Sequence, residues 1–486
     1  MSRKITIDPV TRVEGHGKVT IKLDDNDQVE YARLHIVEFR GFERFVQGRP
    51  YWEAPVLVQR LCGICPVSHH LCAAKAMDVV VGVPPDALTP TADKMRRLMH
   101  YGQVFQSHVL HFFYLASPDL LFGFESDPTQ RNIVGLIQQF PELAKKAVLM
   151  RKFGQEVIRV TAGKKIHGTG AVPGGINKHL TPAERDELCT ARPDLSPDLM
   201  VEWAQEGLAL FKSYHRSNRQ LVDGFAAFPS NHMSLVRKDG ALDLYHGVLR
   251  AVDANGQKIF DQLDYQDYQQ HLAEEVRSFT YMKFPFIKEL GPQKGWYRVG
   301  PLARLNTCDF IPTPLAQAEF EQYKAYTGGL PNGMSMHMHW ARLIEILHAA
   351  EMMRLLLADP DLYAGELVRQ GPRRSEGVGL LEAPRGTLFH HYRVGDDDLI
   401  KMCNLIVSTT SNNEAMNRSV SWVASHRMNG QREIPEGMLN QVEVAIRAYD
   451  PCLSCATHAV GKMPLQIVLL DAHEQLIDQV QRDGAA

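Results

Sequence analysis

Arg60-Leu61-Cys62-Gly63-Ile64-Cys65 lies near the start of the chain, and Asp450-Pro451-Cys452-Leu453-Ser454-Cys455-Ala456-Thr457-His458 lies near its end. Each stretch holds a Cys-x-x-Cys pair, so the two supply four thiols. Thiolates are soft ligands that suit zinc, iron and nickel better than hard cations. If the fold joins the two ends of the chain, we expect one buried metal centre made from both pairs.

A histidine follows each pair at a regular spacing. His458 completes an i, i+3, i+6 pattern that would lie on one face of a helix, and Pro451 would suit its first turn. His69 lies seven residues after Cys62 and could reach back to hydrogen-bond a thiolate of its own pair. One Cys-x-x-Cys alone is also typical of a structural zinc site or a thiol redox couple. The residues that flank the two cysteine pairs are needed to distinguish these alternatives.

The composition describes an ordinary soluble protein. The chain has 486 residues, of which 44% are hydrophobic and 22% charged, with a formal net charge of -3. Lys and Arg are scattered, so no basic patch indicates nucleic-acid binding. The N-terminus lacks an apolar run of secretory length, and no window approaches a membrane span. We therefore expect a cytoplasmic enzyme.

The other four cysteines carry no pattern. Eight cysteines are too few for a disulfide scaffold in a chain of this length, and a reducing compartment favours free or metal-bound thiols. Cys72, Cys189, Cys308 and Cys403 have no matching partner and are expected to be small buried hydrophobic residues.

Hydrophobic periodicity predicts a mainly helical protein. Alternating apolar residues predict strands at 18–23 and 31–39, separated by a turn at 24–27. Long apolar stripes without internal proline predict helices at 91–116, 141–160, 198–225 and 337–357. Glycine- and proline-rich passages at 171–175 and 382–386 are expected to be loops that enter the core. With no clear linker, the prediction is a mainly α protein with small β elements (α+β), a central helical bundle and a small N-terminal sheet in one large body.

The flanks of both pairs resemble the large, catalytic subunit of nickel-iron hydrogenases. Arg-x-Cys-Gly-x-Cys with a histidine four residues on, ending at His69, is similar to the first signature of that family. Asp-Pro-Cys-x-x-Cys-x-x-His, ending at His458, is similar to the second. Further family motifs follow in the same order, namely 8–16, 40–43, 173–175 and 382–386. A structural zinc site would explain the cysteines but none of these companions, and the related quinone-reductase subunit lacks the four cysteines.

The resemblance implies a nickel-iron centre. Nickel would be held by all four thiolates, with Cys62 and Cys452 terminal, while Cys65 and Cys455 bridge to an iron that carries carbon monoxide and cyanide. The reaction implied is reversible heterolytic cleavage of H2 to protons and electrons.

Three further residues take roles from the resemblance. Arg385 corresponds to the family's arginine that faces the iron ligands and the gas site, where its fixed fork of donors is suitable. Thr409 corresponds to a hydroxyl that hydrogen-bonds a cyanide, although the residue before it is serine where respiratory members usually have proline. Cleavage of H2 also needs a base, and here Cys452 would pass the proton to Glu14.

Magnesium and a processing step are implied as well. Glu43 lies where the family has a magnesium ligand, and His458 with the backbone carbonyl of Leu405 would complete the protein side of the site. Residues 1–458 would form the catalytic domain. Residues 459–486 would be an extension that a maturation endopeptidase removes after His458, once nickel and iron insertion proteins have loaded the centre.

The electron acceptor is expected outside this chain. No Gly-x-Gly-x-x-Gly follows a strand, no Walker-type phosphate loop occurs, and no further cysteine cluster could hold an iron-sulfur relay. FMN, NAD and iron-sulfur clusters are therefore expected in partners. The motifs at 65–71 and 450–458 most resemble soluble NAD-reducing hydrogenases, which have a flavin diaphorase and an iron-sulfur small subunit.

Two alternatives stay open within the resemblance. One is a membrane-linked uptake hydrogenase that feeds quinone, and the other is a hydrogen-sensing regulatory subunit. The C-terminal extension disfavours the sensor, because sensors of this family typically lack it.

Overall fold

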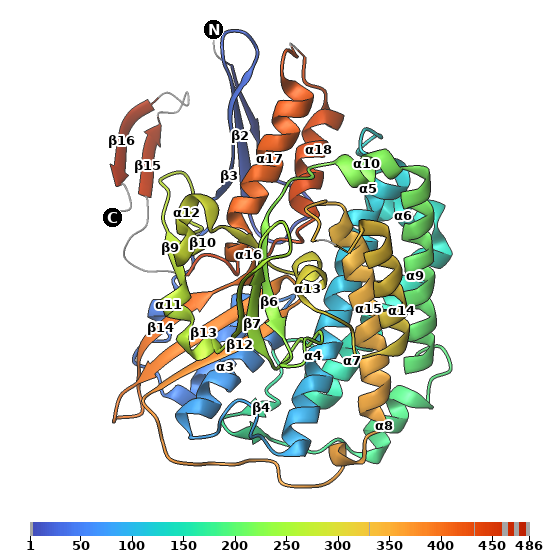
Figure 1. The fold of residues 1–486 in the computed structure, drawn as a ribbon, viewed down its shortest axis with the longest axis vertical. Helices are drawn as coiled ribbons and strands as arrows, with labels where there is room; N and C mark the ends of the chain where they lie inside the picture. Colours follow the sequence, from blue (N-terminus) through green and yellow to red (C-terminus); the bar gives the residue numbers. More distant parts are fainter. Residues whose placement is uncertain (1–2, 330, 432, 459–464, 471–475, 483–486) are drawn as a thin grey trace.

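The computed structural model describes residues 3–329, 331–431, 433–458, 465–470 and 476–482. Long helices form one side of the molecule, and a set of small sheets forms the other (Figure 1). This arrangement confirms the predicted α+β class with a helical bundle and small sheets in a single body. Among the described helices, none combines the length and the apolar character that a membrane crossing requires.

The N-terminal sheet is antiparallel, in the order β1 (Arg3–Ile7), β2 (Gly17–Leu23), β3 (Val29–Ile36). β2 and β3 match the two predicted strands, although β3 ends at Ile36. Helix α17 (Asn413–Met428) packs on β3, and α18 (Glu436–Arg447) packs on α17. The sheet therefore lies beside the helix pair that leads into the second cysteine pair.

The helical bundle contains the four predicted helices, except that the one predicted for 198–225 ends at Ser217 and a separate short helix, α10 (Arg219–Gly224), follows. The four helices are α4 (Pro90–Leu110), α7 (Pro141–Ala162), α9 (Pro197–Ser217) and α15 (His337–Leu357). Helix α4 packs against α7 and α15, and α15 packs against α9. Thr89 and Ser196 cap α4 and α9, each followed by proline at the first helical position, which is a favourable helix start. Helix α4 runs on through a π-helical turn, His111–Ala116.

Two glycines let α4 and α7 approach closely. A Cβ atom on Gly102 would lie 2.9 Å from a side-chain atom of Val157, and one on Gly154 would lie 2.7 Å from the carbonyl oxygen of Gly102. Both distances are too short for a real Cβ contact. Glycine at these positions sets the distance between the two helices.

Two passages predicted as loops are turns of hairpins. Residues 171–175 connect β4 (Ala171–Val172) to β5 (Gly175–Ile176). Residues 382–386 join β12 (Glu376–Ala383) to β13 (Gly386–Val394), which pairs in turn with β14 (Ile400–Ile406). This sheet packs against α3 (Pro66–Val80). The tip of the β12–β13 hairpin is thereby brought to the first cysteine pair.

A four-stranded sheet in the middle of the chain was not predicted. Its order is β11 (Tyr297–Arg298), β6 (Asn231–Val236), β7 (Val248–Val252), β8 (Lys258–Leu263). The other elements are short apart from α14, and are η1 (Tyr51–Glu53), η2 (Val58–Leu61), η4 (Tyr265–Asp267), η5 (Lys288–Leu290), η6 (Pro360–Leu362), α1 (Phe42–Phe45), α2 (Ala54–Leu57), α5 (Ser117–Phe122), α6 (Ile133–Gln139), α8 (Pro182–Cys189), α10 (Arg219–Gly224), α11 (Tyr268–His271), α12 (Gly291–Lys294), α13 (Pro301–Thr307), α14 (Pro314–Thr327), α16 (Ser408–Ser411), β9 (Leu272–Glu275), β10 (Phe284–Ile287), β15 (Leu465–Leu470) and β16 (Leu476–Arg482).

The helical conformation considered for residues 452–458 was a wrong prediction. This segment is a run of turns, and Cys452 pairs as an isolated bridge with Glu14. This bridge competes with helix formation, because the backbone N–H of Leu453 donates to the carbonyl of Glu14 at 3.0 Å and not to a carbonyl of its own segment. Beyond His458, residues 465–470 form β15 and pair with β16, whereas 459–464 lie outside the described residues.

Candidate metal centre

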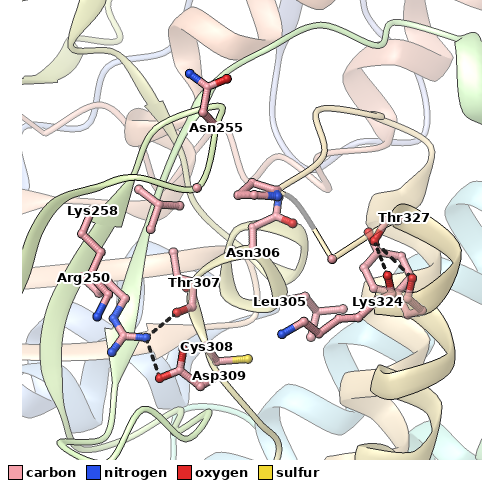
Figure 2. A pocket seen from close by; sticks show the side chains of 15 residues that line it. Arg250, Asn255, Lys258, Leu305, Asn306, Thr307, Cys308, Asp309, Lys324 and Thr327 are labelled. Carbon is pink, nitrogen blue, oxygen red and sulfur yellow. Dashed lines mark hydrogen bonds and ion pairs between the residues drawn. The ribbon is translucent and has the colours of Figure 1, made fainter.

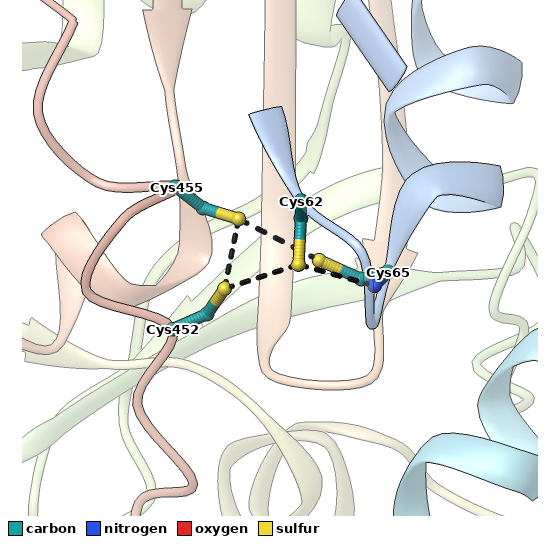
Figure 3. A group of neighbouring side chains, drawn as sticks. All are labelled: Cys62, Cys65, Cys452 and Cys455. Atoms are coloured by element: carbon teal, nitrogen blue, oxygen red, sulfur yellow. Dashed lines mark hydrogen bonds between the residues drawn. The ribbon is translucent and has the colours of Figure 1, made fainter. Parts of the chain in front are cut away.

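Four thiols meet in the interior, as Figure 3 shows. The sulfur atoms of Cys62, Cys65, Cys452 and Cys455 all lie within 4.8 Å of one another, and all four residues are buried. The Sγ atoms of Cys62 and Cys452 are 3.4 Å apart, and those of Cys65 and Cys455 are 3.8 Å apart. The structure therefore joins the two ends of the chain at one cluster.

Different elements position the two pairs. Cys62 follows the short helix η2, and Cys65 immediately precedes α3. The backbone N–H groups of Ile64 and Cys65 donate to the Cys62 sulfur at 3.1 and 3.3 Å, which fixes the position of this sulfur. The second pair lies in the turns after α18, and the bridge to Glu14 fixes them.

The thiols cannot all ionise without a cation. Burial raises the pKa of Cys452 and of Cys455, and the thiols of Cys62 and Cys65 act in the same direction on both. Hydrogen bonds from Cys452, Cys455 and Cys62, with a smaller one from His69, lower the pKa of Cys65. A soft divalent metal ion among the sulfurs would remove the repulsion between thiolates. The donor set therefore fits a thiolate-bound metal centre.

Arg385 is the cation next to the cluster. It lies at the β12–β13 turn, fully inside the protein, and its guanidinium donates to Asp450 at 3.0 Å and to Ser107 at 3.4 Å. Burial alone would lower the pKa of Arg385, but Asp450 and the nearby thiolates outweigh it and raise that pKa. Burial also raises the pKa of Asp450 to about 6, against the effect of Arg385. A permanent positive charge thus faces the thiols.

A small cavity lies beside the sulfurs. Thr409 lines it and accepts a hydrogen bond from the backbone N–H of Cys452 at 3.0 Å, which leaves its own hydroxyl hydrogen free to donate. Ser68 also lines the cavity, and its buried hydroxyl has no hydrogen-bond partner among the described residues. The cavity therefore offers polar donors to small ligands next to the thiols.

Glu14 lies on the other side of Cys452. Its Oε2 atom is 3.0 Å from the Cys452 sulfur and accepts from the backbone N–H of Ser454 at 3.2 Å. This is hydrogen-bond distance, as proton transfer between thiol and carboxylate requires. The side chain is partly exposed, so that it lies between the buried sulfur and the surface.

Glu43, Leu405 and His458 are the residues expected to bind magnesium. Glu43 is buried and accepts a hydrogen bond from the backbone N–H of Leu405 at 2.9 Å, and burial raises its pKa to about 7. The Nε2 atom of His458 contacts the carbonyl of Cys455, and its buried Nδ1 atom has no partner among the described residues. A buried carboxylate of this kind and an unpartnered imidazole nitrogen fit a cation site.

His69 takes part in a chain of rings. Its Nδ1 atom is 3.1 Å from Nε2 of His390, whose Nδ1 atom is 2.8 Å from the hydroxyl of Tyr392. Burial lowers the pKa of His390. His390 was missed at the level of sequence, together with Asp450, Ser68 and Ser107. Asp450 and Ser68 lie inside the motifs at 450–458 and 65–71, whereas His390 and Ser107 carry no signal in the sequence.

Of the remaining cysteines, Cys72, Cys308 and Cys403 are buried as predicted, and Cys189 is half-buried. Burial raises the pKa of Cys72 and of Cys308. Inert buried thiols of this kind need no ligand role.

A larger hollow lies away from the thiols (Figure 2). It is bordered by β7, β8, α13 and α14. Its cation Arg250 is already paired with Asp261 at 2.7 Å and with Asp309 at 3.1 Å. Lys258 also contacts Asp261. Arg250 and Lys258 are thus paired with carboxylates, and Lys324, which also lines the hollow, lies over the ring of Phe320. The hollow offers no comparable cluster of reactive groups among the residues that the structure describes.

A second group of ligand-type side chains forms a closed network. Asp223 lies 2.9 Å from Nε2 of His215 and 3.0 Å from Nε2 of His337, and it accepts from the hydroxyl of Tyr326. These donors lower the pKa of Asp223 to about 2, although burial alone would raise it. The carboxylate is fully hydrogen-bonded by its neighbours, as a structural role requires.

The converging thiols, the facing guanidinium and the acid beside one sulfur define a metal-dependent oxidoreductase subunit. Comparison with known proteins agrees. Residues 4–39 match the HoxL-like family model, and residues 40–122 and 233–458 match the nickel-dependent hydrogenase model. The chain belongs to the nickel-iron hydrogenase large-subunit family.

Two similar proteins match this chain over nearly its whole length. The NAD-reducing hydrogenase HoxS subunit beta of Cupriavidus necator is 53% identical over 489 residues, covering 99% of this chain and 100% of that protein. An F420-non-reducing hydrogenase subunit of Methanothermobacter thermautotrophicus is 41% identical over 486 residues, covering 99% of each.

Solved structures share the fold. A crystal structure of an NAD+-reducing NiFe-hydrogenase in the H2-reduced state is 55% identical, with a TM-score of 0.89 over 94% of this chain and 99% of that chain. A Ni-Fe-Se hydrogenase of D. vulgaris Hildenborough is 23% identical, with a TM-score of 0.71 over 94% and 100%, and shows the fold alone.

Proposed function

We propose that this chain cleaves H2 reversibly to protons and electrons within a complex that passes the electrons to NAD. The observation that carries the proposal is the cluster of four buried thiols with Glu14 in contact with Cys452. The NAD-reducing relatives, at 53% and 55% identity over nearly the whole chain, support the choice of acceptor.

The four thiols would hold the nickel-iron centre. Cys62, Cys65, Cys452 and Cys455 would be its protein ligands, and its iron would carry carbon monoxide and cyanide. When bound, this centre would polarise H2 and take up its electrons. The protein supplies soft ligands in a site that excludes bulk water, because all four cysteines are buried.

The chain's own groups would manage the proton. The Cys452 sulfur would take the proton from H2, and Glu14, at 3.0 Å, would accept it from the thiol. The Ser454 amide keeps the Glu14 carboxylate aimed at the sulfur. The direction of the transfer reverses when H2 is produced.

Arg385 and Thr409 would orient the small ligands and the gas. The Asp450 carboxylate fixes the Arg385 guanidinium, so that its charge faces the thiols without rearrangement. Thr409 has a free hydroxyl hydrogen at the cavity and would donate it to a cyanide. Ser68 offers a further buried hydroxyl in the same cavity, unpartnered among the described residues.

A magnesium ion would be held by Glu43, His458 and the carbonyl of Leu405. It would neutralise the buried carboxylate and anchor the last described residues before 459. The 28 residues after His458 would be the extension that a maturation endopeptidase removes, leaving 1–458 as the catalytic domain.

Partners would complete the enzyme. The thiol cluster of the described residues accounts for one centre, so the iron-sulfur relay, FMN and the NAD site would lie in a diaphorase and a small subunit. We propose a cytoplasmic location, in keeping with an acceptor that is a soluble nucleotide.

Co-purification and a coupled assay test this function. The tagged chain, purified with its native partners under nitrogen, should reduce NAD when H2 is admitted and should release H2 from NADH. A complex that consumes H2 with an artificial dye but never reduces NAD would contradict the acceptor. A nickel-loaded complex without any H2 chemistry would contradict the reaction itself.

A further inference from the structure

A second carboxylate continues the line from the thiols through Glu14 toward the surface. The Ser454 hydroxyl donates to Oε2 of Glu38 at 2.9 Å, while the Ser454 amide donates to Glu14. The other oxygen of Glu38 contacts Nδ1 of His16. The side chain of Glu38 is 28% exposed and that of His16 is 67% exposed. The four residues thus lead from the cluster to solvent.

Each group in this line can both accept and give up a proton. A serine hydroxyl accepts at its oxygen and donates its hydrogen, a carboxylate accepts and then donates, and an imidazole can accept at Nδ1 and release from Nε2. The step from Glu14 to the Ser454 hydroxyl needs a rotation of the carboxyl group or one bridging water, since the direct contact is to the amide.

The charged groups that face Glu38 keep its carboxylate ready to accept a proton. Burial would raise the pKa of Glu38, but hydrogen bonds from His16 and Ser454, with the charges of His16 and Arg40, lower it. Glu38 is therefore ionised at neutral pH.

We propose that Ser454, Glu38 and His16 form the outer half of the proton path, and that Glu38 is the carboxylate through which protons from Glu14 reach solvent. The inference rests on the proposed function and adds the route beyond Glu14. For each H2 cleaved, Glu14 gives one proton to the Ser454 oxygen, and Ser454 gives its original hydrogen to Glu38. Once Glu38 is protonated, the exposed His16 ring moves its hydrogen from Nδ1 to Nε2 through solvent water, accepts the Glu38 proton at Nδ1 and releases the Nε2 proton to water, which restores the Nδ1–H form that donates to Glu38. Each group ends in its starting protonation state, so no oxidant or reductant is needed.

The alternative is direct release from Glu14, whose side chain is itself partly exposed. The two routes differ in what the removal of Glu38 does. Direct release would leave proton exchange with solvent intact in Glu38→Gln, whereas the proposed path would not. Glu30→Gln is a matched control, because Glu30 lies on β3, eight positions before Glu38 in the same segment, and pairs with surface Lys22.

The test uses the assembled complex and compares two reactions. Conversion of para-H2 to ortho-H2 requires cleavage and recombination within the site, whereas exchange between D2 and water also requires the proton to leave. In Glu38→Gln we expect para–ortho conversion within about twofold of wild type and D2–water exchange slowed by about tenfold or more. Ser454→Ala should show the same split, and Ser454→Thr, which keeps the hydroxyl, should restore most of the exchange. Glu30→Gln should match wild type in both.

A second measurement covers variants that assemble poorly. His16→Ala should slow D2–water exchange, and imidazole added to the buffer should restore it, because the His16 position is open to solvent. Unchanged exchange in Glu38→Gln, or parallel loss of both reactions with normal nickel content, would overturn the path. If wild type performs neither reaction, the proposed function fails instead, and the two failures are distinguishable.

Discussion

The Sγ atom of Cys452 lies 3.0 Å from Oε2 of Glu14, although the two residues are 438 positions apart in the sequence. The same two segments pair through their backbones, with the N–H of Leu453 donating to the carbonyl of Glu14 at 3.0 Å. Closure of the C-terminal segment over the cluster and assembly of the acid–thiol pair are therefore one structural event. The proposed chemistry depends on this pairing.

The first prediction concerns Glu14. Glu14→Gln keeps the shape and a donor to the surroundings but cannot carry a proton, so turnover should fall by about 10²–10⁴-fold. Nickel and iron content should stay at the wild-type level, because Glu14 is not a ligand of the centre. The measurement is H2-dependent dye reduction together with metal analysis. Wild-type turnover in Glu14→Gln would remove Glu14 from the proton path.

The second prediction concerns the ligands. Cys452→Ser replaces a soft thiolate by a weakly coordinating hydroxyl, so nickel content and activity should both fall by about 100-fold or more, beyond the 10–100-fold typical of residues that only support ligands. Cys189→Ser is the matched control, because Cys189 is half-buried and lies outside the cluster. It should retain metal and activity. Full nickel occupancy in Cys452→Ser would contradict the ligand assignment.

The third prediction concerns a buried ion-pair network behind the β12–β13 turn. Arg304 donates to both oxygens of Glu345 at 2.6 Å and to Glu382 at 2.8 Å, and it also holds the carbonyls of Ala383 and Pro384, just before Arg385. Removing the guanidinium leaves two buried carboxylates uncompensated. Arg304→Met should therefore lower the free energy of unfolding by about 3–5 kcal/mol.

Chemical denaturation of the complex measures this change. The control is Arg237→Met, because the Arg237–Asp239 pair is exposed and should contribute about 1 kcal/mol or less. Equal midpoints for Arg304→Met and wild type would show that the network does not stabilise the fold.

The fourth prediction concerns the stability of the fold at acidic pH. Burial lowers the pKa of His70, His100, His108 and His348 to about 4 each. Unfolding restores their ordinary value near 6.5, so between pH 6.5 and 4 the unfolded chain binds more protons than the folded chain, and stability falls as pH falls. Each such group contributes a slope of up to about 1.4 kcal/mol per pH unit.

Denaturation midpoints at pH 7, 6 and 5 should therefore decrease steadily. His100→Gln should make the slope shallower by one proton, since its Nε2 only contacts the carbonyls of Leu244 and Glu382, which an amide can replace. Midpoints that do not change from pH 7 to 5 would show that these histidines are not the groups that titrate on unfolding.

Parts of the fold follow from local patterns. Helices such as α7 and α15 were predicted because apolar positions recur at helical spacing without proline. β12 and β13 were missed because nearly every residue in them is buried, which removes the alternation that identifies a half-exposed strand. The segment after Asp450 has helical spacing but pairs with Glu14, a contact from the other end of the chain that no local pattern can show.

Some residues of the candidate site could likewise be predicted from the sequence, and others could not. The cysteines, Glu14 and Arg385 lie in motifs, and the structure brings them together around one cluster. Ser68 lies in the motif at 65–71 but was given no role, and His390 and Glu38 lie in no motif. Their places depend on how α3, β13 and the residues after β3 pack in three dimensions. Sequence alone therefore identified the chemistry of the centre better than its surroundings.

The central claim is a nickel-iron centre held by four cysteines from both ends of the chain. The most direct test is an infrared spectrum of the complex, purified with its native partners, in the triple-bond stretching region under nitrogen and then under H2. The account predicts bands of carbon monoxide and cyanide that shift when H2 is admitted. Absence of these bands in a protein that contains zinc at the four thiols would contradict it.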